Sequence, residues 1–106
     1  MHVATVVGTV WSTIKDESLT GLRFLIVQPL DAAGRAGAET MVAADNIGAG
    51  IGERVLVVHG RAARYLIGRG HDVGMQTAVA GIIDRMELAD GRTIGTTVEH
   101  DTEAGQ

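Results

Sequence analysis

Several residue types are missing or scarce in this chain of 106 residues. There is no cysteine, which excludes a disulfide framework, a thiolate zinc site and a cysteine nucleophile. Tryptophan, tyrosine and phenylalanine occur once each, so a hydrophobic core has to be built from Val, Ile, Leu and Ala. No apolar stretch approaches the roughly 18 residues that indicate a membrane span. Stability therefore has to come from the packing of aliphatic side chains in one small domain.

Positive charge is also scarce. The chain has nine Lys and Arg against 13 Asp and Glu, a formal net charge of −4, and its only lysine is Lys15. Because nucleic-acid binding depends on Lys and Arg that neutralise phosphates, nucleic acid is not an expected partner, and a membrane is not expected either. The strand-like start at residues 2–7 lacks the basic and apolar regions of an export signal, so we expect a cytoplasmic protein.

Short apolar runs between turn residues predict a mainly all-β fold. The expected strands are residues 3–12, 22–27, 39–44, 54–59 and 78–83. Gly8 lies inside the first strand, where a small barrel needs a bend or a bulge. One short helix is expected over residues 61–68, with Ala63, Leu66 and Ile67 on its apolar stripe. Together these elements predict a small five-stranded OB-like β-barrel with one short helix.

The C-terminal part begins with a turn signal at Asp90-Gly91, after which residues 92–98 are expected to pair back. We expect residues 1–98 to form the barrel domain. Residues 99–106 are polar and are expected to form a poorly ordered C-terminal tail.

The first strand is apolar on both faces. One face carries Val3, Val7 and Trp11, and the other carries Ala4, Val6 and Val10. One barrel interior cannot hide both rows. At about 25 cal/mol per Å² of apolar surface, leaving the outer row in water forfeits several kcal/mol, which burial against identical neighbours recovers. The pattern predicts a homo-oligomer.

A glycine occupies every second position in the segment Asp45-Asn46-Ile47-Gly48-Ala49-Gly50-Ile51-Gly52. Glycines at this density allow φ > 0 and close approach of main chains. The spacing differs from the G-x-G-x-x-G of a dinucleotide-binding loop, a β-branched run follows it, and no Walker lysine is present. We therefore interpret the segment as a structural turn or contact loop, and we expect no cofactor.

Catalytic candidates are few. Asp45 could act as a base, but an aspartate before such a loop also bonds its own backbone, and we favour that turn role. Ser12 and Ser18 lie outside any G-x-S-x-G elbow. An enzyme hypothesis would depend on Asp45, Asp84 and the histidines, which nothing in the sequence places together, so we expect no catalytic residues.

The four histidines, His2, His59, His71 and His100, are widely separated in the sequence. None has the short spacing that puts metal ligands on one face, so no metal site is expected. Arg61 and Arg64 share one face of the expected helix at i and i+3. They bond a neighbouring subunit or form a solvated surface, and the pattern leaves both readings open.

Five stretches resemble the vertex proteins of bacterial microcompartment shells, the family of the carboxysome and ethanolamine-utilisation pentamers. They are Gly8-Thr9-Val10-Trp11-Ser12-Thr13 with Lys15, Leu19-Thr20-Gly21, Ala43-Ala44-Asp45-Asn46-Ile47-Gly48-Ala49-Gly50, Gly60 with Ala62-Ala63-Arg64, and Ile82-Ile83-Asp84. Their order and spacing cover most of the chain.

The resemblance implies an OB-like barrel that assembles into a homopentamer and caps the vertices of a polyhedral shell otherwise tiled by hexameric shell proteins. It places the chain in a microcompartment shell of the cytoplasm. Asp45, Asn46, Gly48, Ala49, Gly50 and Arg64 are then expected at the subunit interface or near the central opening. The alternative is an OB-type module that binds an oligonucleotide or a sugar, although such surfaces need stacking aromatics in a positive groove.

Overall fold

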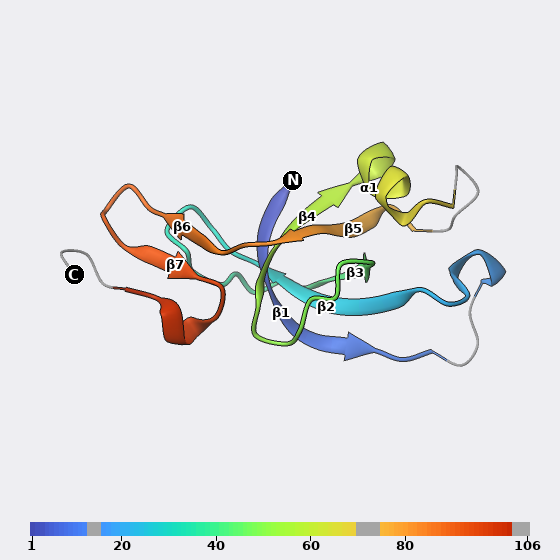
Figure 1. Cartoon of the computed structure of the whole chain (residues 1–106), viewed down its shortest axis with the longest axis horizontal. Coiled ribbons are helices and arrows are strands. Elements are labelled where there is room, and N and C mark those ends of the chain that lie inside the picture. Colours follow the sequence, from blue (N-terminus) through green and yellow to red (C-terminus); the bar gives the residue numbers. More distant parts are fainter. Residues whose placement is uncertain (13–15, 70–74, 103–106) are drawn as a thin grey trace.

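The computed structural model describes residues 1–12, 16–69 and 75–102. Five strands close into a barrel in the order β1-β2-β3-β5-β4 (Figure 1). They are β1 (His2–Val10), β2 (Arg23–Pro29), β3 (Met41–Asp45), β4 (Arg54–His59) and β5 (Thr77–Ile82). The prediction of a five-stranded OB-like barrel with one short helix is confirmed.

The predicted and observed strands differ mainly at their ends. The fourth strand has the predicted bounds, whereas β1 ends at Val10, two residues before the predicted end, and β2 continues through Pro29. The register between β1 and β2 shifts between Val6 and Gly8, which confirms the irregularity predicted at Gly8. A Cβ at Gly8 would lie 3.2 Å from Cδ1 of Ile26, so this glycine also lets the Ile26 side chain cross the strand.

Two hydrophobic clusters contain most of the buried apolar residues of the barrel strands. The barrel interior contains Ala4, Val6, Leu25, Val27, Ala43, Ala49, Val55, Val57 and Val79. The second cluster contains Phe24, Ala44, Val58, Ala63, Ile67 and Ala78. The protomer itself therefore covers part of the surface that we expected only neighbouring copies to bury.

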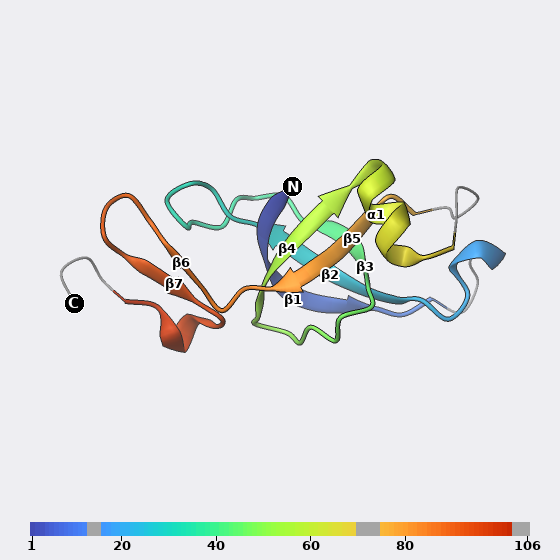
Figure 2. The same ribbon diagram turned by 45° about the horizontal axis from the view of Figure 1, so that its top comes forward.

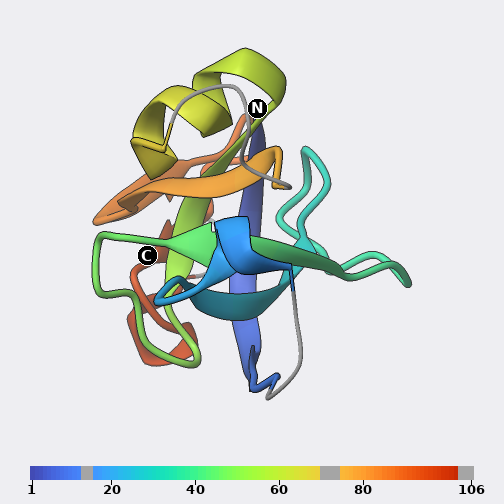
Figure 3. The same ribbon diagram turned by 90° about the vertical axis from the view of Figure 1, so that its right-hand side faces the viewer.

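Helix α1 (Gly60–Ile67) covers the second cluster and packs on β4 and β5 (Figures 2 and 3). It begins and ends one residue before the predicted helix, and Gly68, which follows it, has a φ of 78°, the left-handed conformation common after a helix. Ala63 and Ile67 are buried as predicted, but Leu66 is exposed. The predicted apolar stripe is thus wrong at Leu66, which points toward solvent in the protomer.

A second unit follows the barrel at one end of the long axis (Figure 1). It consists of the antiparallel pair β6 (Arg85–Glu87) and β7 (Thr93–Gly95), joined through the predicted Asp90-Gly91 turn, and the 3-10 helix η2 (Val98–His100). The molecule measures 50 × 25 × 23 Å in consequence. A further 3-10 turn, η1 (Glu17–Leu19), precedes β2.

Part of the predicted tail belongs to this unit. The Asp101 carboxylate accepts hydrogen bonds from the Gly95 backbone and from Arg54 of the barrel, and Thr102 pairs with Thr93. Bonds to distant residues thus connect residues 99–102 to the barrel and to β7, whereas the sequence alone placed them in a separate polar tail. Residues 103–106 lie outside the described ranges.

Candidate functional site

The loop between β3 and β4 is organised by one buried carboxylate. Asp45 is only 4% exposed, and its oxygens accept hydrogen bonds from the backbone N–H groups of Ile47 at 3.0 Å, Gly48 at 3.2 Å and Ala49 at 3.1 Å. Arg23 Nη1 donates a further bond to it at 2.8 Å. These four donors use both oxygens of the carboxylate, which supports the turn role over the role of a base.

The glycines let the loop follow this path. Gly48 and Gly52 have φ values of 98° and 92°, which L side chains rarely adopt. Ala49 between them is fully buried in the barrel core, whereas Ile47 and Ile51 project outward and are exposed. The loop therefore holds two isoleucine side chains in water on a backbone that Asp45 and Ala49 fix in place.

The same loop is connected to helix α1. Asn46 Nδ2 donates a hydrogen bond of 3.2 Å to the carbonyl oxygen of Leu66. Leu66 and the neighbouring Tyr65 are both exposed. The loop that carries Asn46, Gly48 and Gly50 therefore contacts α1 next to the exposed apolar residues of the helix. The sequence alone did not indicate that this loop and helix meet.

Arg64 lies on α1 with its Nε atom buried and without an acceptor among the residues that the structure describes. Arg61, three residues earlier, is exposed. A buried N–H group without an acceptor costs roughly 1–3 kcal/mol, and because this atom is enclosed within the protomer, a neighbouring copy could not reach it in this conformation. The subunit-contact and solvated readings of Arg61 and Arg64 therefore both stay open.

Other apolar side chains are exposed on the outer surface of β1 and β3, on either side of the half-buried Ile26 of β2. Ile26 is paired with Gly8 on one side and with Val42 on the other, and Val7 precedes the irregularity in β1. Val7 and Val42 are exposed, as is Trp11 just beyond β1. The predicted outer row therefore reaches solvent at Val7 and Trp11, although Val3 is half-buried.

Acidic and histidine residues form no catalytic cluster in the part of the chain that the structure describes. Asp84 is exposed beyond β5, and Asp45 is enclosed by its own loop. No group of three or more His, Asp or Glu side chains in these ranges could hold a metal ion. His2 and His59 do meet, at 2.8 Å, in spite of their separation in the sequence, whereas His71 lies outside the described ranges.

Within residues 1–12, 16–69 and 75–102, no helix has the length and apolar character needed to cross a lipid bilayer.

Comparison with known proteins gives one consistent group of relatives. The family described as ethanolamine utilisation protein EutN/carboxysome matches residues 1–84. The carboxysome shell vertex protein CcmL of Synechocystis is 46% identical over 91 residues, covering 86% of this chain and 90% of CcmL. A solved structure of a carboxysome subunit CcmL has a TM-score of 0.80 at 40% identity and full coverage of both chains. The pentameric microcompartment shell protein GrpN of Rhodospirillum rubrum has a TM-score of 0.74 at 39% identity, covering 83% of this chain and 99% of GrpN.

Proposed function

The chain belongs to the EutN/CcmL family of microcompartment shell vertex proteins, and from this premise we propose that five copies form a ring that closes the vertices of a polyhedral shell. The similarity to a pentameric shell protein over nearly its whole length carries the proposal. A flat sheet of hexamers cannot close into a polyhedron, whereas an interface whose rotation closes after five copies supplies the corners. The role is structural, and the proposal assigns no catalytic residue.

Two features of the protomer support an assembly of this kind. The β3–β4 loop presents Ile47 and Ile51 on a fixed backbone, and α1 presents Tyr65 and Leu66 beside it. A loop whose backbone is already held in one conformation loses little backbone freedom when a neighbour covers it. We assign this loop-and-helix surface, formed by residues 46–52 and 64–66, to the subunit interface.

The candidate residues then have different roles. Asp45 and Ala49 are buried within their own protomer, so they shape the interface loop and do not contact a neighbour directly. Asn46 and Gly48 are exposed and can contact it. Gly50 and Arg64 are half-buried, so part of each residue can contact an adjacent copy.

The alternative of an oligonucleotide- or sugar-binding module has less support. A binding module of this type would have the same kind of barrel, but the relatives that share this fold are shell vertex proteins. The proposed partners are therefore other copies of this chain and, at the rim of the ring, the hexameric proteins that tile the shell faces.

Native mass spectrometry of the purified chain tests the proposal. The expected spectrum is dominated by a species of five protomers, each of 11.1 kDa. Negative-stain class averages should show rings with five-fold symmetry. A monomer at micromolar concentration, or a closed ring of another order, would overturn the proposal.

A further inference from the structure

Two histidines that are 57 positions apart in the sequence lie in direct contact on the barrel surface. His2 begins β1 and His59 ends β4, and these two strands pair antiparallel with His2 opposite Val57. His2 Nδ1 lies 2.8 Å from His59 Nε2, and the two rings are nearly perpendicular with centroids 4.9 Å apart. The two ring nitrogens therefore face each other at hydrogen-bond distance, one as donor and the other as acceptor.

The orientation of His59 is held by a second contact. His59 Nδ1 lies 3.2 Å from the Thr77 hydroxyl oxygen, which comes from the adjacent strand β5. When Nδ1–H donates to this hydroxyl, the lone pair remains on Nε2 and faces His2. Such a partner on the second ring nitrogen is the usual feature of a histidine that binds a metal ion.

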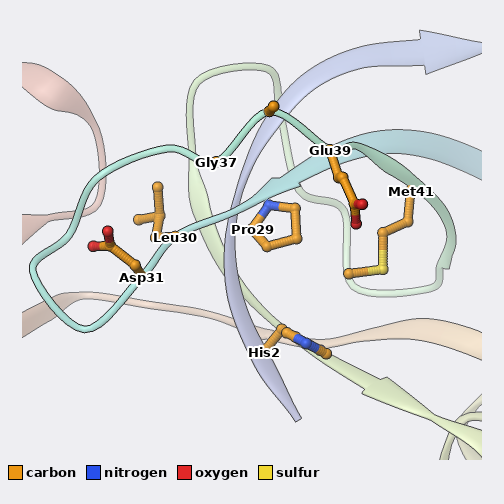
Figure 4. Close-up of a pocket in the computed structure, with 8 residues that line it drawn as sticks. His2, Pro29, Leu30, Asp31, Gly37, Glu39 and Met41 are labelled. Atoms are coloured by element: carbon orange, nitrogen blue, oxygen red, sulfur yellow. The ribbon is translucent and has the colours of Figure 1, made fainter.

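The surface around the pair carries two carboxylates and one hydroxyl. Glu39 and Asp31 are the carboxylates that line the same surface pocket as His2 (Figure 4), and Thr77 is the neutral neighbour on β5.

We propose that His2 and His59 together bind one divalent transition-metal ion of the borderline class, Cu²⁺ or Zn²⁺, on the outside of the barrel. With metal–nitrogen distances of about 2.0–2.1 Å and a tetrahedral angle, the two nitrogens would be about 3.3 Å apart. The observed 2.8 Å thus requires a small outward movement of His2, which is exposed at the start of its strand.

The remaining coordination positions belong to water. In the ranges that the structure describes, no third His, Asp or Glu joins the pair closely enough to form a three-residue set. On binding, the proton at His2 Nδ1 moves to His2 Nε2, so two neutral imidazoles both offer lone pairs and no net proton is released. A two-ligand site of this kind exchanges its metal readily, and imidazole donors favour Cu²⁺ over Zn²⁺ while excluding Mg²⁺ and Ca²⁺.

Metal titration of an untagged protein tests this site. The background carries His71→Gln and His100→Gln, so that only the pair remains, and it is freed of metal with a chelator. Isothermal titration with CuCl₂ at pH 7.5 should give one Cu²⁺ per chain, weaker binding of Zn²⁺, and no heat with MgCl₂. Adding His2→Gln, or His59→Gln, should lower the Cu²⁺ affinity at least about tenfold, because one of two ligands is lost.

The His2→Gln variant keeps the test decisive, since His2 is exposed and its replacement removes no core contact. Circular dichroism checks that each variant is folded. The proposal is overturned if the background protein binds no Cu²⁺, or if either folded single variant, His2→Gln or His59→Gln, binds it with unchanged affinity and stoichiometry; His59→Gln excludes a site made by His2 and the N-terminal amine alone.

Discussion

Arg54 and Asp101 form a two-point ion pair that connects the barrel to the C-terminal unit. Arg54 Nη1 lies 2.7 Å from Oδ1 of Asp101, and Nη2 lies 2.9 Å from Oδ2. The Arg54 side chain is 8% exposed and that of Asp101 is 27% exposed. The same arginine donates from Nη1 to the Gly95 carbonyl and from its backbone N–H to that of Thr96. One residue at the start of β4 thus holds β7 and η2 against the barrel.

Asp101→Asn is expected to lower the free energy of unfolding by about 3 kcal/mol. Removing one partner of a buried ion pair costs roughly 3–5 kcal/mol because the other charge is left uncompensated, and the partial exposure of Asp101 places this pair at the lower end. Urea denaturation at one fixed protein concentration measures the change, since assembly also contributes to stability.

Glu87→Gln is the matched control for this substitution. Glu87 also pairs with an arginine, Arg85, at 3.5 Å, but both side chains are more than 70% exposed. Its loss should change the free energy of unfolding by less than about 0.5 kcal/mol. Equal effects of the two substitutions would show that the Arg54–Asp101 pair does not hold the C-terminal unit in place.

Acid should weaken the same connection. The hydrogen bond from Arg54, and then that from the Gly95 backbone, hold the pKa of the Asp101 carboxyl below its ordinary value of 3.8, against the opposing effect of burial. Because the folded-state pKa is the lower one, the stabilisation is fully present above pH 3.8 and is lost as the pH falls through the folded value. Urea midpoints between pH 7 and pH 2.5 should fall less steeply in Asp101→Asn than in the parent protein. Parallel curves would contradict this assignment.

The local features of this fold could be predicted from the sequence, and the long-range ones could not. The strand at residues 54–59, the irregularity at Gly8 and the turn at Asp90-Gly91 depend on neighbouring residues, and each was confirmed. The connection of residues 99–102 to the barrel depends on Arg54, which is 47 positions before Asp101. No pattern in the neighbouring residues predicts that Asp101 has Arg54 as its partner.

The candidate site shows the same division. The turn role of Asp45 was predictable because its three backbone donors lie two to four residues after it, whereas the bond from Arg23, 22 positions earlier, was not. The contact of His2 with His59 was not, since it depends on the register of β1 against β4. The bond from Asn46 to Leu66 likewise joins a loop to a helix across 20 positions. Spacing in the sequence is therefore a poor guide to which polar side chains share a surface in a barrel this small.

Gly48→Ala should lower the free energy of unfolding by about 1–2 kcal/mol through backbone strain. Gly48 has a φ of 98°, and a Cβ at this position would meet nothing within 4 Å, so the penalty is conformational and not steric. Gly81→Ala is the control, because Gly81 has similar open space and no positive φ. Urea denaturation of both variants should show a loss only for Gly48→Ala, and an unchanged midpoint for that variant would contradict the account of the loop.

Ile51→Asp should dissociate the proposed ring without unfolding the protomer. Ile51 is 67% exposed in the protomer, so aspartate leaves no cavity there. In the assembly, the substitution would lose the roughly 1.5–3 kcal/mol of hydrophobic free energy that a buried isoleucine contributes, and it would place an unpaired charge in the interface. Association should therefore weaken about tenfold or more. Val98→Asp is the matched control, because Val98 is also aliphatic and 67% exposed but lies in η2, outside the loop-and-helix surface. Native mass spectrometry at equal concentrations should show five-protomer species for Val98→Asp and smaller species for Ile51→Asp. If Ile51→Asp retained the full ring, the β3–β4 loop would not be the interface.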